Sequence, residues 1–388
     1  MHAFTYHQPT KIIFGNGSSR GIGQLVKTYG QTVLLVTTGA SEPGLSSLYV
    51  RIKEDLQKAG LKVAHFDGVI PNPTIGVVSE GAAMARDVGA DVIIGLGGGS
   101  SMDAAKAISV EATHEGSCWD YLFYKEQPQA EKLIPVIAVP TTAGTGSHVT
   151  QVAVVTHTDN KDKSALYNPL LFPGLAIVDP ELTLTLPRFV TATTGFDVFC
   201  HAFESILHPA CGAYVEMMGW EAISLVVENL RELLLEPGNL DRRQKMAWAD
   251  TMAGLCIANA GVTLPHGIGM AIGGLYPHVA HGEALALVYP AFAEFTWSSA
   301  VKPFARVARM LNHDLLEVSE EKAAGESALE IRKFLKAINL DSNLADKGIP
   351  ENEIELLASQ SMVLPDYKSN PRVATLDEMV SLLSTIKG

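Results

Sequence analysis

Three histidines, His266, His278 and His281, lie in an apolar, glycine-rich stretch of the sequence. A buried imidazole without a partner costs roughly 1–3 kcal/mol, so each needs a hydrogen-bond partner or a metal ion. Asp197 and His201 stand four residues apart, which places both side chains on one face of a helix. A helical Asp–His hydrogen bond is one explanation of that pair. Together with the other histidines it forms a mixed oxygen and nitrogen donor set, which suits Fe²⁺ or Zn²⁺, with Co²⁺, Ni²⁺ and Mn²⁺ also acceptable.

Two glycine-rich stretches follow apolar runs of the strand type. In GLGGGSSMDAAKAI (95–108), consecutive glycines let a ligand approach the backbone, and the next helix would offer free N–H groups to a pyrophosphate. In VPTTAGTGSHVT (139–150), hydroxyl side chains suit a phosphate or the nicotinamide amide. The alternatives are a plain strand-to-helix connection and a Thr/Gly-rich surface loop. Because the two stretches follow successive strands, they predict a shared nucleotide-binding crevice.

The elements that must position these residues fall into two halves. Residues 1–187 alternate strands and helices, which predicts a doubly wound α/β domain, and residues 188–388 predict an all-helical domain beginning after Pro187. The predicted strands are 32–38, 62–67, 91–97 and 133–140; the predicted helices are 45–60, 74–89, 215–236 and 240–261.

Composition excludes several classes of protein. A net charge of −13 argues against nucleic acid or an anionic membrane as partner. No apolar run approaches the roughly 20 residues that span a bilayer, and no signal peptide is visible. Four scattered cysteines form no CxxC pair, which fits free thiols in a reducing compartment. We therefore expect a cytoplasmic protein.

Taken in order, the motifs resemble the iron-containing (group III) alcohol dehydrogenase family over almost the whole chain. They are KIIFG (11–15), PNPT (71–74), GGGSSMDAAK (97–106), PTTAGTGS (140–147), DPELTLTLP (179–187), GFDVFCHAFES (195–205), HGEALALVYP (281–290) and NPR (370–372). The resemblance implies a Rossmann-like dinucleotide-binding domain, a helical domain of the dehydroquinate synthase-like architecture, and an active site in the cleft between them. It also implies metal-dependent, NAD(P)-linked interconversion of primary alcohols and aldehydes.

Carried over from the family, the metal ligands are Asp197, His201, His266 and His281. The spacing of His266 and His281 is one residue longer than in many members, which makes His278 a fallback ligand. Many members carry a further histidine in the proton path where this chain has Met270. We therefore hypothesise that His278 or water moves the proton, and we predict His278 and His281 as catalytic residues.

The resemblance also implies a set of nucleotide-binding residues. In the family, the residues matching Asp103 and Lys106 order the cofactor loop, and the residue matching Lys163 reaches the ribose; a solvated surface charge is the alternative for both lysines. His148 replaces the usual glutamate of the threonine-rich loop. The predicted nucleotide-binding residues are Thr38, Gly39, Ser41, Asn72, Gly98, Gly99, Ser100, Asp103, Thr141, Thr142, Thr145, Ser147, Lys163 and Leu182.

Cofactor and substrate preferences follow from single positions. No acid stands at Thr38 or Gly39 to repel a 2′-phosphate, so the sequence leans slightly to NADP(H) over NAD(H). Apolar Met270, Tyr276 and Phe199 favour a small aliphatic or aromatic aldehyde. Glu204 and Glu283, beside the ligand motifs, would either support the ligands or lie on helix surfaces. As partners we expect only a small-molecule substrate and further copies of the chain, as a homodimer or larger assembly with residues 2–13 at the interface.

Three other readings remain open. A dehydroquinate synthase-like lyase also uses NAD and a metal, but it needs basic residues to hold a phosphate-bearing carbocycle. A non-catalytic nucleotide or metal sensor has no need of a complete ligand set. A metal-independent activity of the maleylacetate reductase type leaves the Asp197 and histidine set without a purpose.

Overall fold

The computed structural model describes residues 3–39, 44–124 and 132–388. Its strands are β1 (Lys11–Phe14), β2 (Thr32–Thr38), β3 (Lys62–Val69), β4 (Val92–Gly97), β5 (Val136–Pro140), β6 (Val152–His157), β7 (Asp162–Tyr167) and β8 (Leu175–Val178). Its α-helices are α1 (Ile22–Val26), α2 (Leu45–Lys58), α3 (Ile75–Asp87), α4 (Gly99–Thr113), α5 (Arg188–Leu207), α6 (Ala213–Leu235), α7 (Leu240–Asn259), α8 (Leu264–Leu275), α9 (His281–Thr296), α10 (Val301–Leu311), α11 (Glu320–Gly325), α12 (Ser327–Ala337), α13 (Ile354–Ser361) and α14 (Leu376–Ser384).

The chain forms two compact units. The α/β unit comprises the described parts of Gln8–Leu186 together with Gly238–Ala247, which include the first turns of α7. The helical unit comprises residues 3–7, Pro187–Pro237 and Trp248–Gly388. The predicted boundary after residue 187 differs from this division at two short segments, residues 3–7 and 238–247.

The α/β unit is built on a parallel sheet with strand order β1-β8-β5-β4-β2-β3. Alternate residues of each strand point to opposite faces, so Leu34 and Val36 join a core with α3 and α4, while Val33 and Leu35 join one with α1 and α2. Cores on both faces explain why these strands read as continuous apolar runs. This confirms the predicted doubly wound α/β class.

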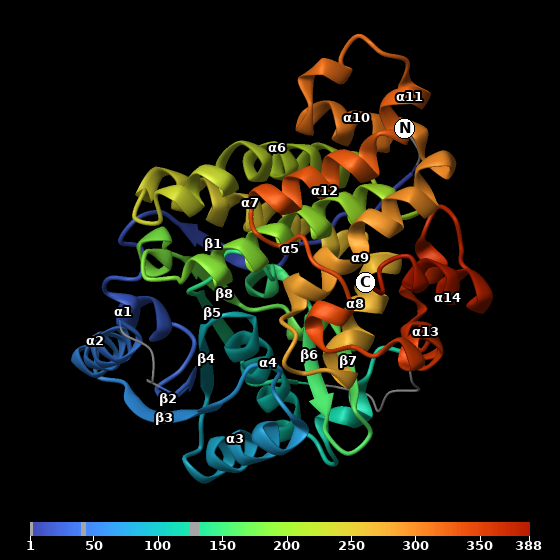
Figure 1. Ribbon diagram of the computed structural model, residues 1–388. Coiled ribbons are helices and arrows are strands. Elements are labelled where there is room, and N and C mark those ends of the chain that lie inside the picture. The colour runs from blue at the N-terminus through green and yellow to red at the C-terminus, as the bar shows by residue number, and fades with distance from the viewer. Residues whose placement is uncertain (1–2, 40–43, 125–131) are drawn as a thin grey trace. The chain divides into compact units, whose positions relative to one another are not determined.

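A separate antiparallel pair, β6 and β7, is not among the predicted elements (Figure 1). Its register pairs Val152 with Tyr167 and His157 with Asp162. Alternate residues of β6 are buried, and Val155 and Ala153 join the core that contains α4. The hairpin therefore packs against the helix that follows the first glycine-rich loop.

The helical unit is organised around α5, which is buried along most of its length. Phe196 and Phe199 stack with ring centroids 5.7 Å apart, and the Phe199 ring lies 5.9 Å from that of Tyr289 on α9. The Phe199 side chain is fully buried in this aromatic core. Because its position on α5 directs Phe199 into the packing of the helices, this residue gives no support to the expectation of a small aliphatic or aromatic aldehyde.

No single helix among the described residues is long and apolar enough to cross a membrane. Helices α7 and α8 reach that length and hydropathy only as a pair, across a bend of 101°.

Candidate metal centre and nucleotide-binding loops

The four predicted ligand side chains come from three helices of the helical unit. Asp197 and His201 lie one turn apart on α5, His266 lies in the first turn of α8, and His281 is the first residue of α9. Asp197, His201 and His266 are buried, whereas the side chain of His281 is 25% exposed. The packing of α5, α8 and α9 thus brings together side chains that are far apart in the sequence.

Distances within this cluster are those of a ligand set. Asp197 Oδ1 lies 3.5 Å from His201 Nε2, 3.6 Å from His266 Nε2 and 4.0 Å from His281 Nε2. Ligand atoms 2.0–2.2 Å from a tetrahedral ion lie about 3.4 Å from one another. Asp197, His201 and His266 meet that spacing closely, and His281 stands slightly farther out.

In the described chain, the buried Asp197 Oδ1 and the buried His266 Nε2 have no hydrogen-bond partner. Leaving such groups unpaired costs free energy, roughly 1–3 kcal/mol each and more for a charged one. A divalent cation would satisfy both atoms at once, and one carboxylate with three imidazoles suits such an ion chemically. The residues present therefore fit a metal.

Glu204 orients the His266 ring. Its Oε1 lies 2.8 Å from His266 Nδ1, and its Oε2 accepts the backbone N–H of Thr263 at 2.8 Å. An acidic acceptor keeps the proton on Nδ1, which leaves the Nε2 lone pair directed at the cluster. Glu204 is fully buried. The alternative of a helix-surface position for Glu204 is therefore wrong.

The charges of the cluster support one another. Burial opposes ionisation of Asp197, but the imidazoles of His201, His281 and His266 outweigh it and lower the pKa of this carboxyl to about 2. Burial likewise lowers the pKa of His266, yet the neighbouring Glu204 and Asp197 carboxylates raise it to about 10. Without a cation, His266 therefore carries a second proton at Nε2, and a metal ion bound there would replace that proton.

His278 does not join the cluster. Its ring is exposed, and its Nε2 donates to the Lys347 carbonyl oxygen at 2.9 Å. The turn between α8 and α9 directs it there, because Val279 N bonds back to Tyr276 O at 2.9 Å and buries Val279 instead. The geometry thus gives no support to His278 as a fallback ligand or proton carrier. The Tyr276 hydroxyl donates to Glu353.

Asp366 also lies near the cluster, although no sequence motif indicated it. Its Cβ lies 3.9 Å from the position of a Cβ on Gly267, the residue after His266. Burial raises the pKa of Asp366 to about 6, with His266 opposing the rise and Glu204 adding to it. Only the packing of residues 365–369 against α8 brings it there, so no local pattern could have indicated it.

In the α/β unit, the two glycine-rich loops lie at adjacent strand ends. β4 and β5 are neighbours, and Thr141 N donates to Gly97 O at 2.9 Å. A Cβ on Gly99 would meet Thr145 Cγ2 at 2.6 Å, so only glycine allows this approach. Thr142 Oγ1 is buried without a hydrogen-bond partner in the described residues. Gly98, Gly99 and Ser100 begin α4, whose first N–H groups remain available to an anion.

Lys106 and Asp103 form a closed buried network beneath these loops. Lys106 Nζ lies 2.7–3.3 Å from four oxygens, those of Ser147 Oγ, Thr150 O, Thr150 Oγ1 and Val152 O. Asp103 accepts from Ser147 Oγ at 2.6 Å and from Val154 N at 3.0 Å. The surface-charge alternative for Lys106 is therefore wrong. Its ammonium group anchors the second loop and β6 to α4.

His148 lies against this network and is fully buried. Burial, with the positive charge of Lys106 adding to it, lowers the pKa of His148 to about 3. The imidazole is therefore neutral at physiological pH. Because His148 is neutral, Asp103 supplies the negative charge near Lys106.

The remaining predicted nucleotide-binding residues differ in position. Lys163 is buried and donates to Asn72 Oδ1 at 2.9 Å, so the surface-charge alternative is wrong for it as well. Thr38 ends β2, next to β4, and its hydroxyl lies 3.0 Å from the Tyr49 hydroxyl. Leu182 packs against the core on the α1–α2 face. Gly39 follows β2, whereas Ser41 lies outside the described residues.

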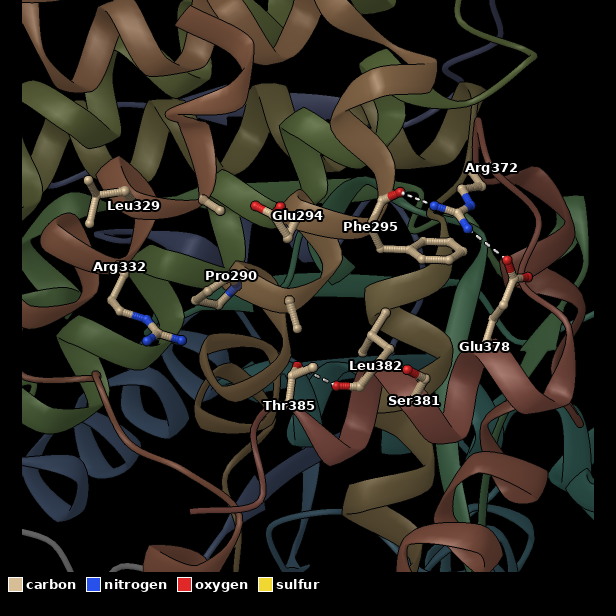
Figure 2. A pocket seen from close by; sticks show the side chains of 12 residues that line it. Pro290, Glu294, Phe295, Leu329, Arg332, Arg372, Glu378, Ser381, Leu382 and Thr385 are labelled. Atoms are coloured by element: carbon tan, nitrogen blue, oxygen red, sulfur yellow. Dashed lines mark hydrogen bonds and ion pairs between the residues drawn. The ribbon is translucent and has the colours of Figure 1, made fainter. Parts of the chain in front are cut away.

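A pocket of about 480 Å³ lies elsewhere in the helical unit, between α9, α12 and α14 (Figure 2). Arg372 crosses its rim, stacked 4.0 Å over Phe295 and paired with Glu378 at 2.7 Å. None of the predicted site residues lines it.

Comparison with known proteins identifies the family of the chain. Residues 9–180 match the family described as iron-containing alcohol dehydrogenase, and residues 191–387 match the C-terminal domain of the Fe-containing alcohol dehydrogenase family. The chain belongs to the iron-containing alcohol dehydrogenase family. The predicted family and enzyme class are confirmed, and the lyase and sensor alternatives are not favoured.

Relatives within the iron-containing alcohol dehydrogenase family align along nearly their full length. The choline dehydrogenase of Bacillus subtilis (strain 168) is 33% identical, with 95% of this chain and 91% of the relative covered. The NAD-dependent methanol dehydrogenase of Bacillus methanolicus is 31% identical, with 97% of each covered. The solved structure of an archaeal halo-thermophilic alcohol dehydrogenase from a Red Sea brine pool superposes with a TM-score of 0.92 at 32% identity, covering 99% of each chain. The family therefore implies a metal and a nicotinamide cofactor for this chain.

Proposed function

We propose that Asp197, His201, His266 and His281 hold one divalent ion, Fe²⁺ in the first instance, in an enzyme that interconverts a small primary alcohol and its aldehyde. The observation that carries this proposal is the buried Asp197 Oδ1, which makes no hydrogen bond in the described chain and has three imidazole Nε2 atoms 3.5–4.0 Å away. Zn²⁺, Co²⁺, Ni²⁺ and Mn²⁺ remain chemically acceptable to the same donor set.

The reaction is hydride transfer between C4 of the nicotinamide and the carbonyl carbon, with one proton exchanged at the substrate oxygen. When bound, the metal supplies Lewis acidity toward that oxygen. Asp197 contributes one negative charge and the three histidines bind as neutral imidazoles, so a net positive charge is retained. Glu204 keeps the His266 Nε2 lone pair directed inward. In the α/β unit, Gly98, Gly99 and the first turn of α4 bind the pyrophosphate of the dinucleotide.

The choice between NAD(H) and NADP(H) depends on the end of β2. The absence of an acid at Thr38 and Gly39 supports acceptance of the 2′-phosphate. The name of the Bacillus methanolicus relative supports use of NAD(H). We retain the slight lean to NADP(H) as a prediction; a large excess of kcat/KM for NADH over NADPH would refute it.

Substrate, assembly and location also stay predictions. Met270 and Tyr276 remain the apolar residues on which the expectation of a small aliphatic or aromatic aldehyde rests. The homodimer or larger assembly is expected from the family resemblance, with residues 2–13 at the interface, and the cytoplasm from the scattered thiols.

A kinetic panel tests the proposed function. Purified protein is stripped with a chelator, reloaded separately with Fe²⁺, Zn²⁺, Co²⁺, Ni²⁺ or Mn²⁺, and assayed with straight-chain and aromatic aldehydes and both reduced nucleotides. We expect activity to vanish on stripping and to return with Fe²⁺. Activity that survives complete removal of metal would refute the assignment.

A further inference from the structure

His281 is the least enclosed of the four proposed ligands. Its side chain is 25% exposed, against 7% for each of the other two histidines and 4% for Asp197. It is also the first residue of α9, directly after the turn 276–280, where helix ends tend to fray. Its Nε2 is the farthest of the three from Asp197 Oδ1. The position of this ligand therefore depends on what holds the first turn of α9.

One side of that turn rests on α5. A Cβ on Gly282 would lie 2.1 Å from Thr193 O, so the glycine lets the backbone of α9 lie directly against α5. Ala280, the residue before α9, has no side-chain acceptor for the free N–H groups at the start of that helix. A hydrogen-bond acceptor must therefore come from another side chain.

Glu283 provides that acceptor and links it to a distant segment. Its Oε2 accepts the N–H of Ala280 at 3.2 Å, and its Oε1 accepts from Lys347 Nζ at 2.7 Å. The two side chains of the ion pair are only 13% and 25% exposed. A carboxylate in the first turn also interacts favourably with the helix dipole. Both oxygens of Glu283 are thus used to fix the backbone that carries His281.

The segment that carries Lys347 is itself anchored. Leu344 N and Ala345 N donate to Ile386 O at 2.9 Å and Lys387 O at 3.1 Å, and Leu344 and Ile349 are buried. Two more contacts reach the same turn: His278 Nε2 to Lys347 O, and the Tyr276 hydroxyl to Glu353. Residues 344–353 therefore bind the turn 276–283 at three points.

We propose that the Lys347–Glu283 ion pair is a strap that holds His281 in position as a metal ligand, with Lys347 and Glu283 as positioning residues. The inference rests on the proposed function, since it presumes that His281 binds the ion. Loss of the strap frees the first turn of α9 while leaving Asp197, His201 and His266 in place. The consequence is weaker metal binding through one ligand, without loss of the fold.

The test measures Co²⁺ binding to the full-length, metal-stripped protein by competition with a chromophoric chelator. Lys347→Met is compared with Lys387→Met, which breaks the exposed Lys387–Glu351 pair nearby and does not touch α9. We expect Lys347→Met to weaken Co²⁺ affinity about 10- to 100-fold and to alter the visible Co²⁺ spectrum. The metal-free Tm should stay near that of wild type, and Lys387→Met should bind as wild type does.

Wild-type affinity and an unchanged spectrum in Lys347→Met would overturn the strap while leaving the proposed function intact. A wild-type protein that binds no Co²⁺ would overturn both. If Lys347→Met fails to fold, the same measurement is made on Glu283→Gln. The amide oxygen of that variant can still accept the N–H of Ala280, so only the ion pair with Lys347 is lost. Wild-type binding by that variant would overturn the strap, and a loss similar to that expected for Lys347→Met would support it.

Discussion

The charged clusters of the two units differ in how far their polar atoms are hydrogen-bonded. In the α/β unit, Lys106 Nζ has four oxygen neighbours and both oxygens of Asp103 accept hydrogen bonds. In the helical unit, Asp197 Oδ1 and His266 Nε2 are buried without hydrogen bonds within the described chain. A satisfied cluster stabilises the fold, whereas an unsatisfied one costs free energy unless something else binds there. The contrast separates a structural network from a site for a ligand.

Replacing the carboxylate of the unsatisfied cluster should have the largest effect. Asp197→Asn removes the only carboxylate among the four proposed ligands. The several kcal/mol that a metal contributes to catalysis correspond to a fall of about 10³-fold or more in kcat/KM. The variant should copurify without metal. NADH binding, measured by fluorescence, should be unchanged because the nucleotide loops lie in the other unit. Normal activity in the variant would remove the distinction between the two clusters.

Breaking the satisfied cluster should affect stability and not metal binding. Lys106→Met removes the positive charge near Asp103 and leaves the oxygens of Ser147, Thr150 and Val152 without this donor, which costs about 3–5 kcal/mol of unfolding free energy. Lys58→Met breaks an exposed pair, with side chains 71% and 57% exposed, and should cost less than about 1 kcal/mol. Urea unfolding of the three proteins makes the comparison. Metal content should be unaffected in both variants, and its loss in Lys106→Met alone would contradict a purely structural role.

A smaller effect is expected from Glu204, which contacts the proposed ligand His266. Glu204→Gln places an amide N–H against either His266 Nδ1 or Thr263 N, where a carboxylate now accepts from both. Metal affinity should fall about 10- to 100-fold. Glu228→Gln is the matched control, because the Glu228 carboxylate accepts only a hydrogen bond from Ser224 on the exposed side of α6 in the described contacts. Equal affinities in the two variants would show that Glu204 does not orient the ligand.

The last expected effect is a dependence of stability on pH. The pKa of His148 is about 3 in the folded protein, against 6.5 for an unperturbed imidazole. Between those values the unfolded chain binds the proton and the folded chain does not, so stability falls as pH falls. The contribution is about 1.4 kcal/mol per pH unit between about pH 6 and pH 3. His148→Gln lacks this contribution, and its urea midpoint should fall less from pH 6 to pH 4. Parallel pH profiles would contradict a buried neutral His148.

The sequence predicts local features well and long-range partners poorly, for a physical reason. Strand β2 matches the predicted 32–38 because its apolar run is bounded by polar residues at both ends. Asp197 and His201 could be paired because helical spacing alone brings them to one face. The partners Glu204 and His266 are 62 residues apart, and Lys347 and Glu283 are 64 apart. Such contacts depend on how helices pack, as do Asp366 beside α8 and the exposed position of His278, and no local spacing encodes them.

The most direct test of the unsatisfied cluster is its metal stoichiometry. Elemental analysis of gently purified wild-type protein, beside Asp197→Asn and His266→Ala, counts the bound divalent ions per chain. We predict one ion per chain in the wild type and none in either variant, with all three proteins folded. An ion retained in both variants, or a fully active wild type without one, would contradict it.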